Sequence, residues 1–133
     1  MKKLISIILL CTLILSLSSC GSTGFAKIAG YSSQVYSPAE IEAAIDVVTS
    51  NFKKNWEFCT LLELSYIGDD KLADYQDWAD RNNADDVIVF LSDFYISFFA
   101  NSPTMNNGSE YEGWMWILVR TRGGEWQLVD CGY

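Results

Sequence analysis

The chain contains no histidine, so any acid–base chemistry must come from other side chains. This removes the commonest general base, the Ser-His-Asp arrangement and histidine metal sites. Asp93 and Asp130 are the candidate catalytic residues. Flanked on one face of a predicted strand by Leu91 and Tyr95, Asp93 is suited to act as the general base of a cone-shaped enzyme. The alternative, for Asp130 as well, is a bulge or edge position where the carboxylate reaches water or a backbone donor.

Three tryptophans near the C-terminus, Trp114, Trp116 and Trp126, are the candidate binding residues. Exposed aromatic side chains stack on sugars or anchor protein partners. The alternative is that they pack inside the hairpin on which they lie. No cofactor or metal is expected, because phosphate-binding glycine loops are absent and the cysteines left in the mature chain are too few for a closed zinc site.

The first twenty residues have the pattern of a secretory signal. Lys2 and Lys3 precede an apolar run over 4–17 that ends in Leu17-Ser18-Ser19-Cys20. The run is shorter than the ~20 apolar residues that a membrane span needs. Its last four residues resemble a bacterial lipobox. The resemblance implies cleavage before Cys20, which then carries lipid and anchors the protein at the extracytoplasmic face of the cell membrane. The alternatives are an uncleaved anchor and cleavage at another small residue.

This interpretation decides which cysteines are left to pair. Cys11 leaves with the leader and Cys20 carries lipid, so Cys59 and Cys131 remain. Outside the cytoplasm these two have one intramolecular pairing. We therefore predict a Cys59–Cys131 disulfide bond, which closes a loop of about 70 residues and stabilises the fold by on the order of 4 kcal/mol. Two buried free thiols are the alternative.

The predicted mature chain is strongly acidic. Two of the nine Lys and Arg residues leave with the leader, so seven remain against seventeen acidic residues, a formal charge of −10. Nucleic acid is excluded as a partner because phosphate binding draws on clustered basic residues. Anionic headgroups repel this charge, so the acyl chains and not the protein surface are expected to hold the domain at the membrane. The aspartates between 69 and 86 lack a calcium-loop pattern and indicate a solvated surface.

The predicted helices follow a flexible segment. Residues 20–36 are rich in Gly and Ser and have no lasting periodicity, which predicts a tether. Ser37-Pro38-Ala39-Glu40 is a capping box with proline at the first helical position, so a helix should begin there. Its apolar residues recur at helical spacing. A second, shorter helix is predicted over 71–81.

Strands are predicted over 58–67 and 87–99, and a β-hairpin over 114–131 around Gly123-Gly124. Counting outward from the turn puts Trp116 opposite Cys131 and Val119 opposite Leu128. Trp126 and Leu128 should then share one apolar face with Met115, Ile117 and Val119, and Val129 should share the other with Trp116, Leu118 and Cys131. The predicted fold class is α+β, with two helices packed on a curved antiparallel sheet that ends in the hairpin. One domain (37–133) is expected after a signal peptide (1–19) and a tether (20–36).

From Tyr36 onward the chain resembles small lipoproteins of unassigned function from Gram-positive gut anaerobes. The residues that match include Glu40-Ile41, Phe52-Lys53-Lys54, Cys59-Thr60-Leu61, Trp116-Ile117-Leu118-Val119-Arg120 and Gly132-Tyr133. The resemblance covers nearly the whole domain and implies no catalytic residue. In the order of its elements the chain also resembles, for fold alone, cone-shaped domains such as nuclear transport factor 2 and ketosteroid isomerase.

These observations predict a small binding or protein-interaction module, anchored in the cell envelope. Its expected partners are the lipid bilayer, through acylated Cys20, and an envelope protein or glycan. The alternative is a small cone-shaped enzyme with a buried aspartate as general base. An apolar pocket around Asp93 would favour the enzyme, and exposed tryptophans would favour binding.

Overall fold

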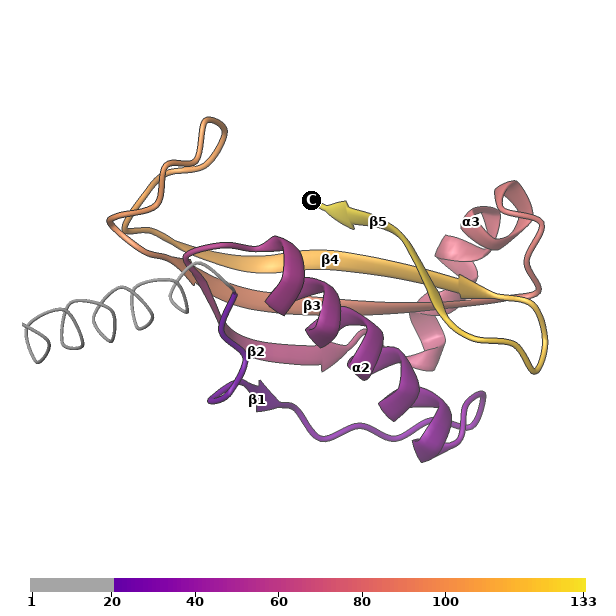
Figure 1. The fold of residues 1–133 in the computed structure, drawn as a ribbon. Coiled ribbons are helices and arrows are strands. Elements are labelled where there is room, and N and C mark those ends of the chain that lie inside the picture. The colour runs from indigo at the N-terminus through magenta and orange to yellow at the C-terminus, as the bar shows by residue number, and fades with distance from the viewer. Residues whose placement is uncertain (1–20) are drawn as a thin grey trace, which may run out of the picture.

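The computed structural model describes residues 21–133, so the predicted leader, Cys11 and Cys20 lie outside the described residues. A sheet of five strands in the order β1-β2-β3-β4-β5 dominates the molecule (Figure 1). The elements along the chain are β1 (Lys27–Ile28), α2 (Pro38–Asn55), β2 (Cys59–Tyr66), the 3₁₀ helix η1 (Asp69–Tyr75), α3 (Gln76–Arg81), β3 (Asp86–Ile96), β4 (Glu110–Arg120) and β5 (Gln127–Gly132). Neighbouring strands are antiparallel except β1 and β2, which are parallel. The predicted α+β class is confirmed.

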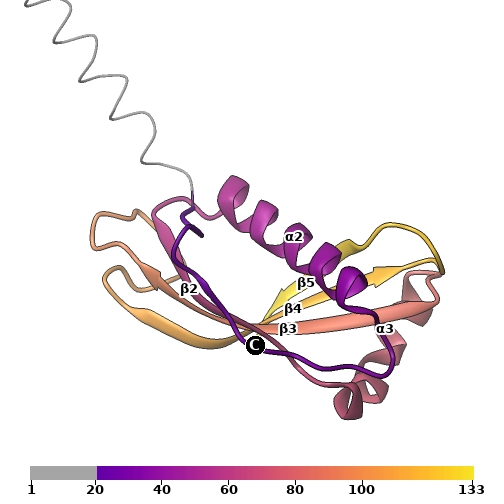
Figure 2. The ribbon, with the colours of Figure 1, turned by 90° about the horizontal axis from the view of Figure 1, so that it is seen from below.

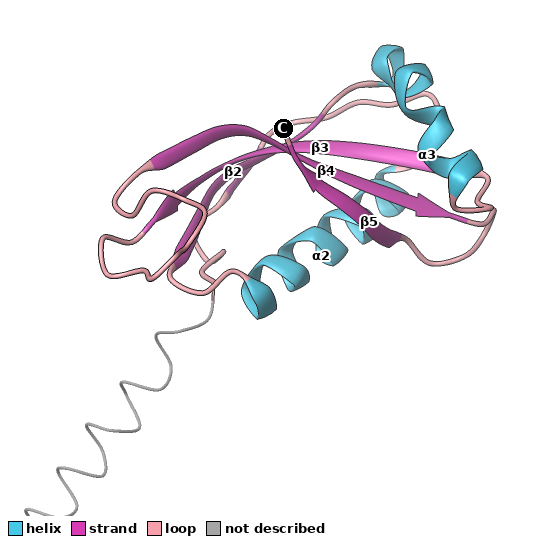
Figure 3. Cartoon of the chain, turned by 90° about the horizontal axis from the view of Figure 1, so that it is seen from above, coloured by secondary structure: helices cyan, strands magenta, loops and turns pink. Residues whose placement is uncertain are grey.

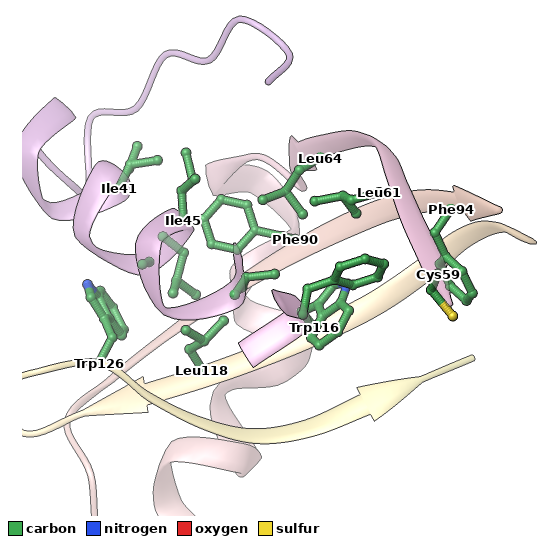
Figure 4. Packing of buried hydrophobic residues seen from close by; sticks show 14 of the residues in the cluster. Ile41, Ile45, Cys59, Leu61, Leu64, Phe90, Phe94, Trp116, Leu118 and Trp126 are labelled. Carbon is green, nitrogen blue, oxygen red and sulfur yellow. The ribbon is translucent and has the colours of Figure 1, made fainter. Parts of the chain in front are cut away.

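Helix α2 lies across one face of the sheet (Figure 2). It begins as predicted, because the Ser37 side chain accepts a hydrogen bond from the Glu40 backbone and the Glu40 side chain accepts one from the Ser37 backbone. Its buried face is the predicted one, formed by Ile41, Ala44, Ile45, Val48 and Phe52. These residues pack on one face of β2, β3, β4 and β5 to form the main core, part of which Figure 4 shows.

The opposite face of the sheet is covered by η1 and α3, which lie at one end of the molecule (Figure 3). The sequence predicted one continuous helix here, but its first half is a 3₁₀ helix. Ala79 packs there on the strand residues Val87, Val89, Ile117 and Val119. Strand β3 is therefore covered on both faces near its start, which explains why it is the most apolar strand.

Strand β3 ends earlier than the apolar run predicts. The run continues to Phe99, but pairing stops at Ile96, and the Ser97 backbone N–H donates instead to the Phe58 carbonyl at 2.9 Å. Phe98 and Phe99 lie in the loop between β3 and β4 and are 74% and 84% exposed.

The hairpin has the predicted strands but a shifted register. Trp116 pairs with Cys131 as predicted, whereas Leu128 pairs with Leu118 and not with Val119. A bulge between these pairs turns Leu128 and Trp126 toward α2 and Val129 toward α3. Counting from the turn assumes that every residue is paired, so it cannot detect a bulge. One unpaired residue in β5 moves the β5 side chains on one side of it to the opposite face of the sheet.

The segment expected to be a flexible tether differs most from the prediction. The Gly21 N–H donates to the Lys53 carbonyl at 3.1 Å, Ser22 exchanges backbone hydrogen bonds with β2, and β1 extends the sheet beside β2. Further along, the Asp69 carboxylate accepts hydrogen bonds from the Ser33 hydroxyl and the Gln34 N–H, both at 2.6 Å. The segment over 21–36 therefore lies along the domain.

Candidate functional site

Asp93, the first candidate base, has a structural role. It lies where the pairing of β3 with β4 shifts between Ser92 and Phe94, and its Oδ1 accepts the Gly113 backbone N–H at 2.9 Å. This is the bulge alternative that the sequence left open. Asp130 is exposed on β5, which forms one edge of the sheet. Neither aspartate lines either of the two hollows described below, so neither hollow supports the enzyme hypothesis at these residues.

The three candidate tryptophans have different environments. Trp116 is fully buried, and its indole N–H donates to the Ser92 hydroxyl at 2.8 Å. Trp114 is half-buried, and its ring meets that of Tyr133 edge to face at 5.1 Å. Trp126 is 5% exposed. Core packing therefore accounts for Trp116, and of the three only Trp126 lines a hollow described below.

Cys59 and Cys131 are both free thiols, so the predicted disulfide bond is not formed. They lie on β2 and β5, which β3 and β4 separate. Three strand spacings amount to roughly 14 Å, whereas bridged cysteines have Cα atoms about 4 to 7 Å apart. Burial raises the pKa of both thiols, which keeps them protonated and unreactive.

An ion-pair cluster that the sequence analysis did not predict joins α2 to the sheet. Arg120, at the end of β4, donates through Nη2 to Glu40 and through Nε to Asp86, the second at 2.9 Å. Its side chain is only 9% exposed. The guanidinium also lies over the ring of Trp126, 4.3 Å from the centroid. The sequence did contain one signal of this cluster, an arginine at the end of an apolar strand. A guanidinium that is buried there requires carboxylate partners.

The aromatic side chains around Arg120 complete the cluster. The Trp126 indole N–H donates to the Glu40 carbonyl at 3.0 Å, and the Tyr36 hydroxyl donates to the Val87 carbonyl at 2.8 Å. Burial raises the pKa of Tyr36 to about 12, so the phenol stays protonated. The hydrogen bond from Arg120 lowers the pKa of Glu40 to about 2, so the carboxylate stays charged. Neither Tyr36 nor Glu40 therefore changes its protonation state near neutral pH.

A hollow of about 550 Å³ opens beside this cluster, between α2 and the turn that joins β4 to β5. We call it the distal groove. Its lining combines apolar surface with three carboxylates and consists of Ala39, Glu40, Ala43, Asp46, Val47, Arg120, Gly124, Glu125 and Trp126. Because Arg120 is already paired with Glu40 and Asp86, the charge presented by the groove is negative. The arrangement suits binding of a cationic group with an apolar flank.

A second hollow, of about 480 Å³, lies at the other end of the sheet, where β2 begins and the β3–β4 loop leaves the sheet. Its lining includes Trp56, Phe58 and Met105.

Within residues 21–133, no group of three or more Cys, Asp and Glu side chains is arranged to hold a metal ion. In that same part of the chain, no helix is both long and apolar enough to cross a membrane.

The search for similar proteins gave no match among protein families, curated proteins or solved structures.

Proposed function

We propose that this protein is an extracytoplasmic lipoprotein, anchored to the cell membrane through Cys20, and that its domain is a binding module. The anchor is supported by the lipobox-like Leu17-Ser18-Ser19-Cys20 after a basic and apolar leader. Several acyl chains on one cysteine give stable attachment where a single chain does not.

The distal groove is the observation that carries the binding proposal. It lies by the N-terminal half of α2 and the β4–β5 turn, at the end of the molecule away from the start of the described chain (Figure 1). A partner in the cell envelope therefore reaches it without competing with the membrane. The lining is held rigidly because Glu40, Arg120 and Trp126 are joined by hydrogen bonds.

The chemistry of the groove favours a protein partner with a basic, amphipathic segment. Asp46 and Glu125 are exposed at its edge, and Ala43 and Val47 provide apolar surface, whereas Trp126 is only 5% exposed. Opposite charges steer association, and apolar contact supplies most of the affinity. Neutral glycans can donate hydroxyl hydrogen bonds to these carboxylates but gain no attraction between opposite charges.

The test is a titration of the purified lipoprotein with a lysine-rich amphipathic peptide, a glutamate-rich peptide of the same length, and a panel of glycans. We expect the lysine-rich peptide alone to bind and to change the fluorescence of Trp126. The double variant Asp46→Lys/Glu125→Lys should weaken this binding by on the order of tenfold or more.

The matched control is Asp74→Lys/Asp80→Lys, which changes the net charge equally at exposed positions on η1 and α3. It should bind like the parent protein, apart from the general effect of charge. Equal weakening in both double variants, or binding of glycans alone, would contradict the proposed groove. The anchor is tested separately through the mass of the N-terminal peptide and through Cys20→Ala, which should lose the lipid.

A further inference from the structure

The chain has seven phenylalanines, and the structure divides them sharply. Phe52, Phe90 and Phe94 are fully buried in the main core. The other four are exposed, Phe25 at 97%, Phe58 at 37%, Phe98 at 74% and Phe99 at 84%. A cluster of large exposed apolar side chains marks an interaction surface.

Backbone contacts bring these four residues to the end of the molecule at which Gly21 lies. The Gly21 N–H donates to the Lys53 carbonyl, and the next residue, Ser22, donates to Cys59. Phe58 precedes Cys59 and accepts from the Ser97 N–H, which fixes the start of the loop that carries Phe98 and Phe99. Phe25 follows in the turn closed by the hydrogen bond from Ala26 to Thr23. The views in Figures 1 to 3 agree that the β3–β4 loop and the start of the described chain lie at the same end.

We name this surface the anchor end. It consists of Phe25, Phe58, Phe98 and Phe99, together with Lys53 and Lys54, which are exposed in the last turn of α2. Three exposed carboxylates also lie at this end, Glu57 beside the lysine pair and Glu110 and Glu112 where β4 begins. Seven of the seventeen acidic residues lie at the far end, on η1, on α3 or just before or at the start of β3: Asp69, Asp70, Asp74, Asp77, Asp80, Asp85 and Asp86. Both the apolar and the charged side chains thus distinguish one end from the other.

We propose that the anchor end docks directly on the lipid bilayer, with Phe25, Phe98 and Phe99 inserted at the interface. The inference rests on the proposed lipid anchor, because Cys20 is joined to Gly21 and Gly21 is hydrogen-bonded to α2. Gly21, the residue after the proposed lipid-bearing cysteine, is already hydrogen-bonded to α2, so lipidation would bring the anchor end close to the membrane surface. Apolar and aromatic side chains bind at this depth, and nearby lysines meet the headgroups.

The orientation also reduces the repulsion expected from the net charge of −10. With the anchor end on the bilayer, the seven aspartates face away from anionic headgroups, and the repulsion between charges further apart than about 10 Å is largely screened. The overall charge of the chain therefore does not prevent its surface from contacting lipid, which modifies the expectation from composition.

The test uses the full chain, processed in a bacterium that lipidates such proteins and reconstituted in vesicles of phosphatidylcholine with some phosphatidylglycerol, with and without bromine on the acyl chains. Two reporters are compared, Phe99→Trp at the anchor end and Val35→Trp at the far end, where Val35 is 56% exposed. We expect brominated lipid to quench the emission that Phe99→Trp adds at least about threefold more strongly than the emission that Val35→Trp adds. The reason is that a side chain at the interface reaches the boundary of the acyl chains. Adding Phe25→Ser and Phe98→Ser should lower that quenching towards the level of Val35→Trp.

Equal quenching of the two reporters on a lipidated protein overturns the docking and leaves the anchor intact. A blue-shifted Phe99→Trp emission that lipid does not quench also overturns it, because a second protein copy then covers the patch. If the N-terminal peptide carries no lipid but Phe99→Trp is still quenched when the protein is added to vesicles, the docking is supported and the proposed anchor fails.

Discussion

Arg120 is the residue whose environment imposes the strongest requirement on the fold, because its buried charge must be paired. Replacing it with alanine leaves Glu40 and Asp86 facing each other without their cation and removes the stack on Trp126. Breaking a buried pair from one side costs about 3 kcal/mol. We therefore expect Arg120→Ala to lower the free energy of unfolding in urea by about this amount. Arg122→Ala, at an exposed position two residues later, should change it by less than about 0.5 kcal/mol; equal losses in the two variants would contradict the paired role.

The same variant should alter the dependence of stability on pH. Glu40 has an ordinary pKa of 4.5, and the hydrogen bond from Arg120 lowers it to about 2 in the folded protein. Because the folded-state pKa is the lower one, this contribution is complete above about pH 4.5 and is lost as the pH falls towards 2. The gap in urea midpoint between the parent and Arg120→Ala should therefore narrow over that range, by an amount that solvent reduces because Glu40 is about one-third exposed. A gap that stays constant down to pH 2 would show that Glu40 does not depend on Arg120.

At the scale of elements, the sequence predicted what local chemistry determines. The capping box set the start of α2, and apolar periodicity set its buried face. The side chains of β3 alternate in the same local way, with Ile88, Phe90, Phe94 and Ile96 in the main core and Val87 and Val89 on the opposite face. Pairing between distant segments was not predictable from local signals. The bulge opposite Leu118, the free cysteines on separated strands and the pairing of 21–36 with β2 all depend on which segment lies beside which.

The close approach of Gly21 to α2 gives the prediction at this scale. A Cβ at Gly21 would lie 2.3 Å from the Phe52 carbonyl oxygen and 2.8 Å from that of Trp56, so one of the two backbones must move. We expect Gly21→Ala to destabilise the domain by about 1 to 3 kcal/mol, as overpacking does. Hydrogen exchange should report faster exchange of the Ser22 N–H, which donates to β2.

Gly24→Ala is the matched control, because a Cβ there meets nothing within 4 Å. It should leave both stability and exchange at Ser22 unchanged. If the two substitutions behave alike, Gly21 does not pack on α2 in solution.

For the whole molecule, the segment over 21–36 would determine how the domain is oriented relative to the membrane in the proposed docking. As a flexible tether, it would let the domain rotate freely above a lipidated cysteine. Because this segment is bonded to α2, β2 and Asp69, in the proposed docking it would hold the anchor end against the membrane and direct the distal groove outward. The sequence suggested a tether because Gly and Ser are frequent there. However, the short β1 needs only two residues to pair, which is too few to produce a periodic pattern.

Replacing residues 21–35 with a Gly/Ser sequence of equal length separates these two descriptions. The variant retains Tyr36, which belongs to the main core, and with glycine at 33 it loses the hydroxyl that donates to Asp69. The added chain freedom also disfavours the β1 pairing and the hydrogen bond from the backbone N–H of 34. At about 1 kcal/mol for each hydrogen bond, we expect urea unfolding to show a loss of about 3 kcal/mol or more. In vesicles the variant should stay lipidated and membrane-bound, whereas brominated lipid should quench Phe99→Trp more weakly, because the domain is then free to turn. A replacement that preserves both stability and quenching would mean that 21–35 acts as a spacer and that the phenylalanines dock without its help.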